Sequence, residues 1–299
     1  MDIKKLYGSI VALVTPFDEK GAIDFPAFDR LIDFHLQNGT SSLLIAGTTG
    51  EGPTITNEEL KTLVSRARSI TGDEYPLIAG TGTNSTLSTI QRTKIAEESG
   101  ADFALIVGPY YNKPTQEGFY RHYQAVADAV DVPLIIYNVP GRTGSNILPE
   151  TVIRLFEIPN IVGIKEASGD LKQIQNLLDI KSKNEVVLSG DDALTLSIIG
   201  MGGVGVISVV ANELPEIMSD LVNYALDGEL ESARNLHNKL LPIMEANFIE
   251  SNPIPVKYAL SKMGMISETY RLPMVSLEKK NKDKMDDILN LFGLIKTDG

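Results

Sequence analysis

The 299-residue chain contains no cysteine and only three histidines. Without cysteine, disulfide bonds, thiolate metal sites and a cysteine nucleophile are excluded. His35, His122 and His237 lie far apart in the sequence, and none has a second metal ligand at helical spacing. We therefore expect no metal centre, and each histidine is interpreted as an ordinary, partly exposed side chain.

Positive charge is also scarce, with 27 Lys and Arg against 39 Asp and Glu and a formal net charge of −12. This balance argues against nucleic-acid binding, which rewards clustered basic residues. No segment approaches the ~18 apolar residues of a membrane span. The first five residues, MDIKK, lack the apolar core of a signal peptide. We expect a soluble, cytoplasmic protein that binds neither membranes nor nucleic acid.

From residue 8 a unit recurs, in which a short apolar segment precedes a turn rich in Gly, Thr, Ser and Asn, and an amphipathic stretch follows. The apolar segments predict eight strands, at Ser9–Val14, Ser42–Ala46, Leu77–Ala79, Phe103–Val107, Leu134–Tyr137, Ile161–Lys165, Val186–Leu188 and Val204–Ser208. The amphipathic stretches predict helices near 26–38, 57–70, 86–98, 118–130, 149–156, 170–180, 191–200 and 213–226.

Strands that alternate with helices pair in parallel through crossover connections, and their unbroken apolar character fits a sheet buried on both faces. Eight units in about 225 residues match the size of an α/β (β/α)8 TIM barrel. A doubly wound sheet is the second interpretation. After Gly228 the pattern changes to helices alone, at 229–247, 253–263 and 282–295. We predict a catalytic barrel at 1–227 and a helical C-terminal region at 228–299 that packs against it.

The C-terminal ends of barrel strands carry the chemistry of such folds. Lys165 ends one buried strand there, and burial of an amine lowers its pKa toward the neutral form that attacks a carbonyl. Lys165 is therefore a candidate Schiff-base nucleophile. The alternative is a lysine whose amine extends to solvent or pairs with Glu166.

Other polar side chains converge on the same rim. Tyr137 ends the preceding strand and could transfer protons, or else simply cap the barrel core. Thr48 and Thr49 lie between glycines after the second strand, where hydroxyls and turn amides suit a carboxylate or, alternatively, cap the next helix. Arg142 follows Tyr137 and is either a carboxylate anchor or a solvated loop residue.

The segment GMGGVG at 200–205 fits the pattern GxGxxG of dinucleotide-binding proteins. It follows a predicted helix and leads into a strand, whereas that fingerprint must follow a strand and open a helix. We therefore assign no nucleotide cofactor to it.

Six motifs in order along nearly the whole chain resemble the dihydrodipicolinate synthase (4-hydroxy-tetrahydrodipicolinate synthase) family of the pyruvate-dependent class I aldolases, which also include N-acetylneuraminate lyase. They are GTTGE at 47–51, PYYNKPTQEG at 109–118, YNVPGRTG at 137–144, GIKEASGD at 163–170, SGDD at 189–192 and NPIPVK at 252–257.

This resemblance implies a homotetrameric lyase of lysine and diaminopimelate biosynthesis that condenses pyruvate with L-aspartate 4-semialdehyde and needs no metal or organic cofactor. Lys165 would form the Schiff base with pyruvate. By position, Tyr137, Thr48 and Tyr111 would form a proton relay, with Tyr111 coming from a neighbouring subunit. Thr49 would bind the pyruvate carboxylate, together with the backbone of Gly190 and Ile207. Arg142 would bind the carboxylate of the semialdehyde.

Two other functions stay open at this point: another pyruvate-dependent aldolase, such as a sialic-acid or keto-sugar-acid lyase, and a catalytically silent barrel that binds a ligand. Arg142 and the Thr48-Thr49 pair favour the synthase over sialic-acid lyases. The sequence departs from the lysine-inhibited members of the family, because it lacks their histidines and glutamate. The corresponding residues are Gly52, Pro53, Asn57, Leu60 and Ser88, although Asn84 and Tyr110 remain. We therefore expect weak or absent inhibition by lysine.

Overall fold

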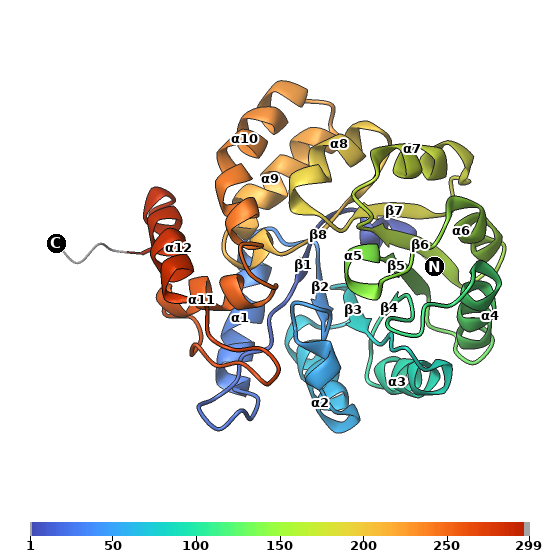
Figure 1. Cartoon of the computed structure of the whole chain (residues 1–299), viewed down its shortest axis with the longest axis horizontal. Helices are drawn as coiled ribbons and strands as arrows, with labels where there is room; N and C mark the ends of the chain where they lie inside the picture. Colours follow the sequence, from blue (N-terminus) through green and yellow to red (C-terminus); the bar gives the residue numbers. More distant parts are fainter. Residues whose placement is uncertain (1, 296–299) are drawn as a thin grey trace.

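The computed structural model describes residues 2–295 and contains a closed barrel of eight parallel strands (Figure 1). The strands are β1 (Gly8–Ala12), β2 (Ser42–Ile45), β3 (Leu77–Gly80), β4 (Phe103–Val107), β5 (Leu134–Asn138), β6 (Ile161–Glu166), β7 (Val186–Ser189) and β8 (Gly205–Ser208). Each strand pairs with its neighbour in the sequence, and β8 pairs with β1. This closure confirms the predicted (β/α)8 barrel and rules out the doubly wound sheet.

A ring of helices surrounds the barrel and connects the strands (Figure 1). They are α1 (Phe25–Gln37), α2 (Asn57–Thr71), α3 (Thr86–Glu98), α4 (Gln116–Ala127), α6 (Pro149–Phe156), α7 (Leu171–Ile180), α8 (Thr195–Gly200) and α9 (Pro215–Leu226). Local chemistry fixes where they begin. Helix α2, for example, starts with a capping box, in which the Thr56 hydroxyl accepts from the Glu59 amide and the Glu59 carboxylate accepts from the Thr56 amide.

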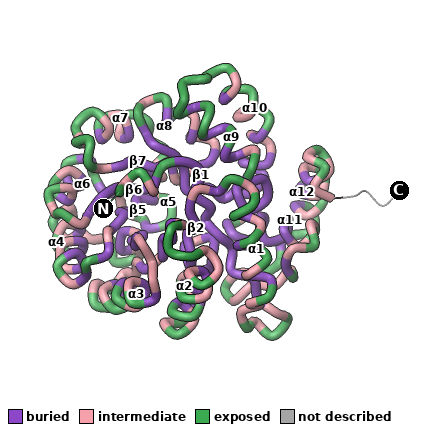
Figure 2. The backbone as a smooth tube through the Cα atoms, turned by 180° about the vertical axis from the view of Figure 1, so that it is seen from behind, coloured by how far each residue is buried: buried purple, intermediate pink, exposed green. Residues whose placement is uncertain are grey.

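The strands are buried on both faces, as their apolar sequences predict (Figure 2). Alternate residues face the barrel interior, where Ile10, Leu44 and Tyr137 belong to one cluster with Leu6 of the 3-10 helix η1 (Ile3–Leu6). The other residues of each strand pack outward against the helices, as Val11 and Leu43 do. A barrel filled in this way is a solid core, so a ligand has room only at its ends.

The pairing of β5 with β6 contains one irregularity. Leu134 pairs with Ile161, but Ile135 pairs with Gly163, so β6 has one more residue than β5 at this point. This is the signature of a β-bulge. Beyond it the ladder is regular, and Tyr137 lies opposite Lys165.

Some predicted boundaries differ from those observed. The first strand ends at Ala12 and not at Val14, because the Val14 amide donates to Oδ1 of Asn212 instead of to a neighbouring strand. The predicted helix 191–200 is a 3-10 turn, η3 (Asp192–Leu194), followed by α8. A four-residue helix, α5 (Pro140–Thr143), occupies the loop after β5 that the sequence indicated only as a glycine-containing turn.

After α9 the chain forms three helices without another strand, α10 (Leu230–Ala246), α11 (Ile254–Lys262) and α12 (Lys279–Leu291). Apolar residues of α10 and α12, such as Leu240 and Met285, share one core cluster with residues of α1 and α9. Figure 1 shows α11 and α12 beside α1. Met1 and residues 296–299, which the predicted division of the chain includes, lie outside the described residues. None of the helices within residues 2–295 is long and apolar enough to cross a membrane.

Candidate active site

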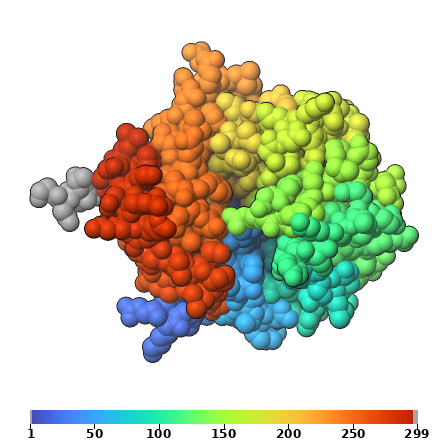
Figure 3. All heavy atoms as spheres, in the orientation of Figure 1, coloured from blue at the N-terminus to red at the C-terminus, as the bar shows by residue number. Residues whose placement is uncertain are grey.

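The C-terminal ends of the strands surround a hollow in the molecular surface, bordered by segments near residues 50, 140 and 250 (light blue, lime and orange in Figure 3). Two adjoining cavities of about 160 and 230 Å³ lie there, and we call them the inner and the outer cavity. Both are lined by Thr48, Tyr137, Val139 and Arg142. The inner cavity also contains Lys165, Thr49, Ala167, Gly190, Asp191, Val209, Phe248 and Asn252.

Lys165 is only 5% exposed, and its Nζ lies 4.5 Å from the centre of the Tyr137 ring in the inner cavity. Within the described residues no side chain forms an ion pair with it. Burial lowers the pKa of Lys165 to about 8, although Asp192 raises it, and Arg142 lowers it further. With this pKa, roughly a tenth of the amines are neutral at pH 7, about 300 times more than for an ordinary lysine.

Glu166 is not the partner of Lys165, because alternation along β6 places the two side chains on opposite faces of the barrel wall. The buried Glu166 carboxylate accepts from Nδ2 of Asn138, at 3.2 and 3.1 Å, and from the amide of Ser168, at 2.7 Å. Burial raises the pKa of Glu166, and these hydrogen bonds offset that rise only in part. The alternative interpretation of Lys165 as the partner of Glu166 is therefore wrong.

Tyr137 is buried beside Lys165, and Thr48 lines the same cavities. Burial raises the pKa of Tyr137, while Arg142 and the neighbouring Thr48 lower it. The phenol is consequently protonated at neutral pH, with Thr48 in position to exchange a proton with it. The structure thus brings Lys165, Tyr137 and Thr48 together, as the sequence predicted.

Thr49 and Arg142 are connected through a residue of the C-terminal region. Nδ2 of Asn252 donates to the Thr49 hydroxyl at 3.0 Å, and Nη2 of Arg142 donates to the Asn252 carbonyl at 3.3 Å. Thr49 is buried, whereas Arg142 is exposed on α5 at the mouth of both cavities. The two side chains therefore lie at different depths, Thr49 inside the site and Arg142 at its entrance.

The remaining predicted residues differ in their placement. Gly190 lines the inner cavity, and a Cβ there would lie 3.0 Å from Cε of Lys165, so glycine leaves the space that the lysine occupies. Ile207 packs in the barrel interior and is not among the residues that line either cavity. Tyr111 is 89% exposed and also lies outside both cavities of this single chain.

Several residues of the site are not among those that the sequence pattern indicates. Asn252 lies 203 residues from Thr49 in the chain, and its motif NPIPVK was noted only as part of the resemblance. Phe248 lines the inner cavity from the same segment. Asp192 is buried behind Lys165, and its Oδ2 accepts from the amides of Val209 and Val210. Within residues 2–295 no group of three or more His, Cys, Asp or Glu side chains could hold a metal ion.

The sequence matches the Dihydrodipicolinate synthetase family over residues 5–291. This chain belongs to that family. A 4-hydroxy-tetrahydrodipicolinate synthase from Thermodesulfovibrio yellowstonii is 52% identical over 289 residues, which cover 97% of this chain and 99% of the relative. The match confirms the resemblance found in the six motifs.

Solved structures of the dihydrodipicolinate synthase family have the same fold. The crystal structure from Aquifex aeolicus superimposes with a TM-score of 0.95 at 43% identity and covers 98% of this chain and all of its own. The chloride-inhibited enzyme from Acinetobacter baumannii, crystallised with pyruvate, gives a TM-score of 0.95 at 44% identity, with 97% and 99% of the two chains covered.

Proposed function

We propose that this chain condenses pyruvate with L-aspartate 4-semialdehyde to 4-hydroxy-tetrahydrodipicolinate, with Lys165 as the Schiff-base nucleophile. The lyase activity predicted from the sequence is confirmed by relatives of about 50% identity that have this name. The observation that carries the residue roles is a buried lysine with a lowered pKa, 4.5 Å from the ring of a buried tyrosine, in a cavity with hydroxyl groups and an arginine.

The reaction starts with attack of the neutral Lys165 amine on the pyruvate carbonyl. Loss of water from the carbinolamine gives an imine, and the protonated imine makes the pyruvate methyl group acidic. We assign the proton transfers to a relay of Tyr137 and Thr48, which both line the inner cavity with Lys165. Tyr111 completes this relay from a neighbouring subunit in our proposal, since within one chain it is exposed and lines neither cavity.

The enamine then attacks the aldehyde carbon of the semialdehyde and forms the new carbon–carbon bond. The amino group of the semialdehyde next attacks the imine carbon, closes the ring and releases Lys165 as a free amine. One water molecule is lost overall, the one expelled when the imine forms. Every step is a proton transfer or a carbonyl addition or elimination, so we propose no cofactor.

Two anion sites orient the substrates in this scheme. Thr49, with backbone groups of Gly190 and Ile207, is assigned to the pyruvate carboxylate, and Arg142 at the entrance to the carboxylate of the semialdehyde. An arginine offers two parallel donors to a carboxylate, and an uncharged amino sugar would leave that fork without its partner. This arrangement supports the semialdehyde over the acceptors of sialic-acid lyases.

We further propose a cytoplasmic homotetramer in which residues 1–227 form the catalytic barrel and residues 228–299 a helical region packed on it. The shared relay makes a specific prediction about assembly. Tyr111→Phe and a substitution that makes the protein monomeric should both lower turnover. A monomer with full activity would exclude a contribution of Tyr111 from the neighbouring subunit.

The decisive experiment measures pyruvate consumption with aspartate semialdehyde, N-acetylmannosamine and glyceraldehyde as separate acceptors. A parallel sample with borohydride is analysed by intact mass. We expect turnover with the semialdehyde alone and a pyruvate adduct that is absent in Lys165→Ala. An adduct without semialdehyde turnover would assign the chain to another aldolase, and no adduct would refute the Schiff base and indicate a ligand-binding barrel.

A further inference from the structure

The turn that contains Thr48 and Thr49 has an unusual backbone. Ala46 and Glu51, on either side of the two threonines, both have φ of 54°, in the left-handed region that residues with a side chain rarely adopt. Such strain persists only where the surrounding structure enforces it. The turn itself contributes two backbone bonds, from the Glu51 amide to the Thr48 carbonyl and from the Gly52 amide to the Gly47 carbonyl.

A buried ion pair anchors this turn at Glu51. Nζ of Lys257, on α11, lies 2.6 Å from Oε1 of Glu51, and the two side chains are 0% and 2% exposed. The backbone amide of Arg271 donates to Oε2 of the same carboxylate at 3.1 Å. Both carboxylate oxygens are therefore occupied by donors from the C-terminal region.

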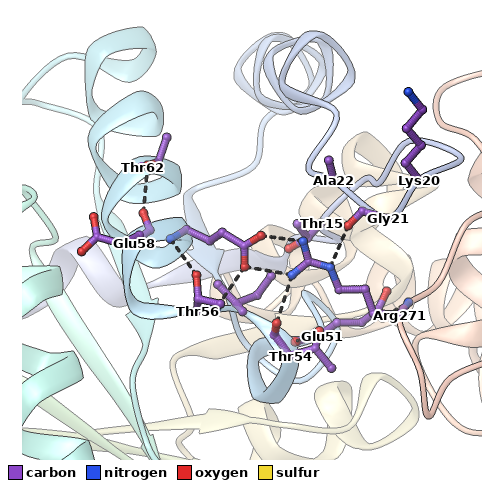
Figure 4. Close-up of polar contacts among 12 residues, drawn as sticks. Thr15, Lys20, Gly21, Ala22, Glu51, Thr54, Thr56, Glu58, Thr62 and Arg271 are labelled. Carbon is purple, nitrogen blue, oxygen red and sulfur yellow. Dashed lines mark hydrogen bonds and ion pairs between the residues drawn. The ribbon is translucent and has the colours of Figure 1, made fainter.

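Arg271 continues the connection with its side chain (Figure 4). Its guanidinium binds both carboxylate oxygens of Glu59 and donates to the carbonyls of Thr54 and Gly21. Nζ of Lys257 and Cζ of Arg271 also each lie 4.3 Å from the centre of the Phe17 ring. The segments before and after the strained turn are thus fixed to one another through the C-terminal region.

Neither Glu51 nor Lys257 lines the inner or the outer cavity. Contact with a substrate therefore does not account for a fully buried ion pair at this place. A buried pair is weak evidence for stability, because desolvation of two charges offsets their attraction. What the pair does accomplish is geometric, since Glu51 lies three residues from Thr48 and two from Thr49.

We propose that Glu51 and Lys257 are positioning residues, which hold the Thr48-Thr49 turn in the conformation that the reaction needs. Through them the C-terminal helices set the distance from the Thr48 hydroxyl to Tyr137 and the direction of the Thr49 hydroxyl. This inference rests on the proposed function of the two threonines. It makes the C-terminal region a structural part of the active site, in addition to the direct contact from Asn252.

The test uses two readouts, condensation kinetics and exchange of the pyruvate methyl protons with deuterium in D₂O. Exchange requires the imine and the proton relay but no acceptor aldehyde. We expect Lys257→Met and Glu51→Ala to lower the exchange rate at least tenfold and to raise KM for pyruvate. KM for the semialdehyde should change less than KM for pyruvate, because Arg142 belongs to a different loop and is connected to the Thr48-Thr49 turn only through Asn252. Glu51→Gln, which keeps one of the two acceptor oxygens, should lower the exchange rate less than Glu51→Ala does.

A double-mutant cycle separates positioning from general stability. Thr48→Val should lower the exchange rate by a far smaller factor in the Lys257→Met protein than in the wild type, because a hydroxyl that is already misplaced contributes little to exchange. The matched control is Lys262→Met, on the same helix, which breaks the more exposed pair with Asp286 at 3.2 Å and should leave the exchange rate unchanged. If Lys257→Met does not fold, Glu51→Gln/Lys257→Met, which has no buried charge at this place, replaces it in the cycle.

The proposal would be overturned if Thr48→Val lowered the exchange rate by the same factor in both backgrounds. It would also be overturned if a folded Lys257→Met protein exchanged at the wild-type rate. Wild-type exchange without condensation would instead refute the semialdehyde as acceptor, while the cycle still decides the role of the ion pair. Absence of exchange in the wild type would refute the proposal together with the proposed function, because no relay would then need positioning.

Discussion

Replacement of Lys165 by methionine should make the protein more stable. The folded state lowers the pKa of this amine from 10.5 to about 8, chiefly through burial. A group that binds its proton less tightly in the folded state destabilises that state wherever the proton is bound. A shift of this size corresponds to about 3 kcal/mol, taking 1.36 kcal/mol for each pKa unit. Methionine has a similar length and no charge to desolvate.

The stability difference between Lys165→Met and the wild type should depend on pH. Between pH 8 and 10.5 the unfolded chain retains a proton that the folded protein has released, so the wild type gains stability as the pH rises. The advantage of the variant should therefore be greatest below pH 8, at about 3 kcal/mol, and fall to about 1.5 kcal/mol at pH 9.5. Urea unfolding followed by circular dichroism at pH 7 and pH 9.5 measures both values.

Lys257→Met provides the contrast, because this lysine is buried with Glu51 as its partner. The same substitution there leaves an unpaired buried carboxylate and should destabilise the protein by about 3–5 kcal/mol. The same substitution should thus stabilise the protein at Lys165 and destabilise it at Lys257, because only Lys257 has a buried carboxylate as its partner. A Lys165→Met protein no more stable than the wild type at pH 7, or an advantage that does not change with pH, would refute the reasoning.

Three further predictions concern the reaction. Below pH 8, kcat/KM for pyruvate should rise about tenfold per pH unit as Lys165 deprotonates and then level off; a flat profile between pH 6 and 8 would contradict the assigned pKa. Arg142→Ala should raise KM for the semialdehyde about 10- to 100-fold, the loss expected for charge-assisted hydrogen bonds, and should slow methyl exchange in pyruvate far less, only because Arg142 no longer helps to lower the pKa of Lys165. Lysine should inhibit weakly or not at all, because Gly52 and Pro53 of the outer cavity offer its ammonium no charge; half-maximal inhibition by submillimolar lysine would disprove this.

Most of the barrel could be predicted because its information is local. Each strand is a short apolar segment bounded by turn residues, and eight such segments at even spacing leave few other arrangements. The convergence of Lys165, Tyr137 and Thr48 followed from the same reasoning, since the C-terminal ends of barrel strands share one rim. The end of β1 was missed because a side chain from distant Asn212 replaces the strand ladder.

The parts of the site that escaped prediction depend on contacts between distant segments. Asn252 and Lys257 come from the C-terminal region, and nothing in the local pattern of NPIPVK indicates that one contacts Thr49 and the other Glu51. The choice between an unpaired Lys165 and one paired with Glu166 was likewise left open. It depends on which side chain faces inward, and this is set by pairing with neighbouring strands.

The bulge between β5 and β6 determines which of these two side chains faces inward. Val162 faces the barrel interior and Ile164 the helices, so Lys165 faces inward three residues after Val162, where regular alternation would turn it outward. The one additional residue thus reverses the parity of the strand. If the same six residues alternated regularly from Val162, the amine would face the helices and Glu166 would face the cavity. The irregularity in β6 therefore decides which of two adjacent ionisable side chains, Lys165 or Glu166, reaches the cavity.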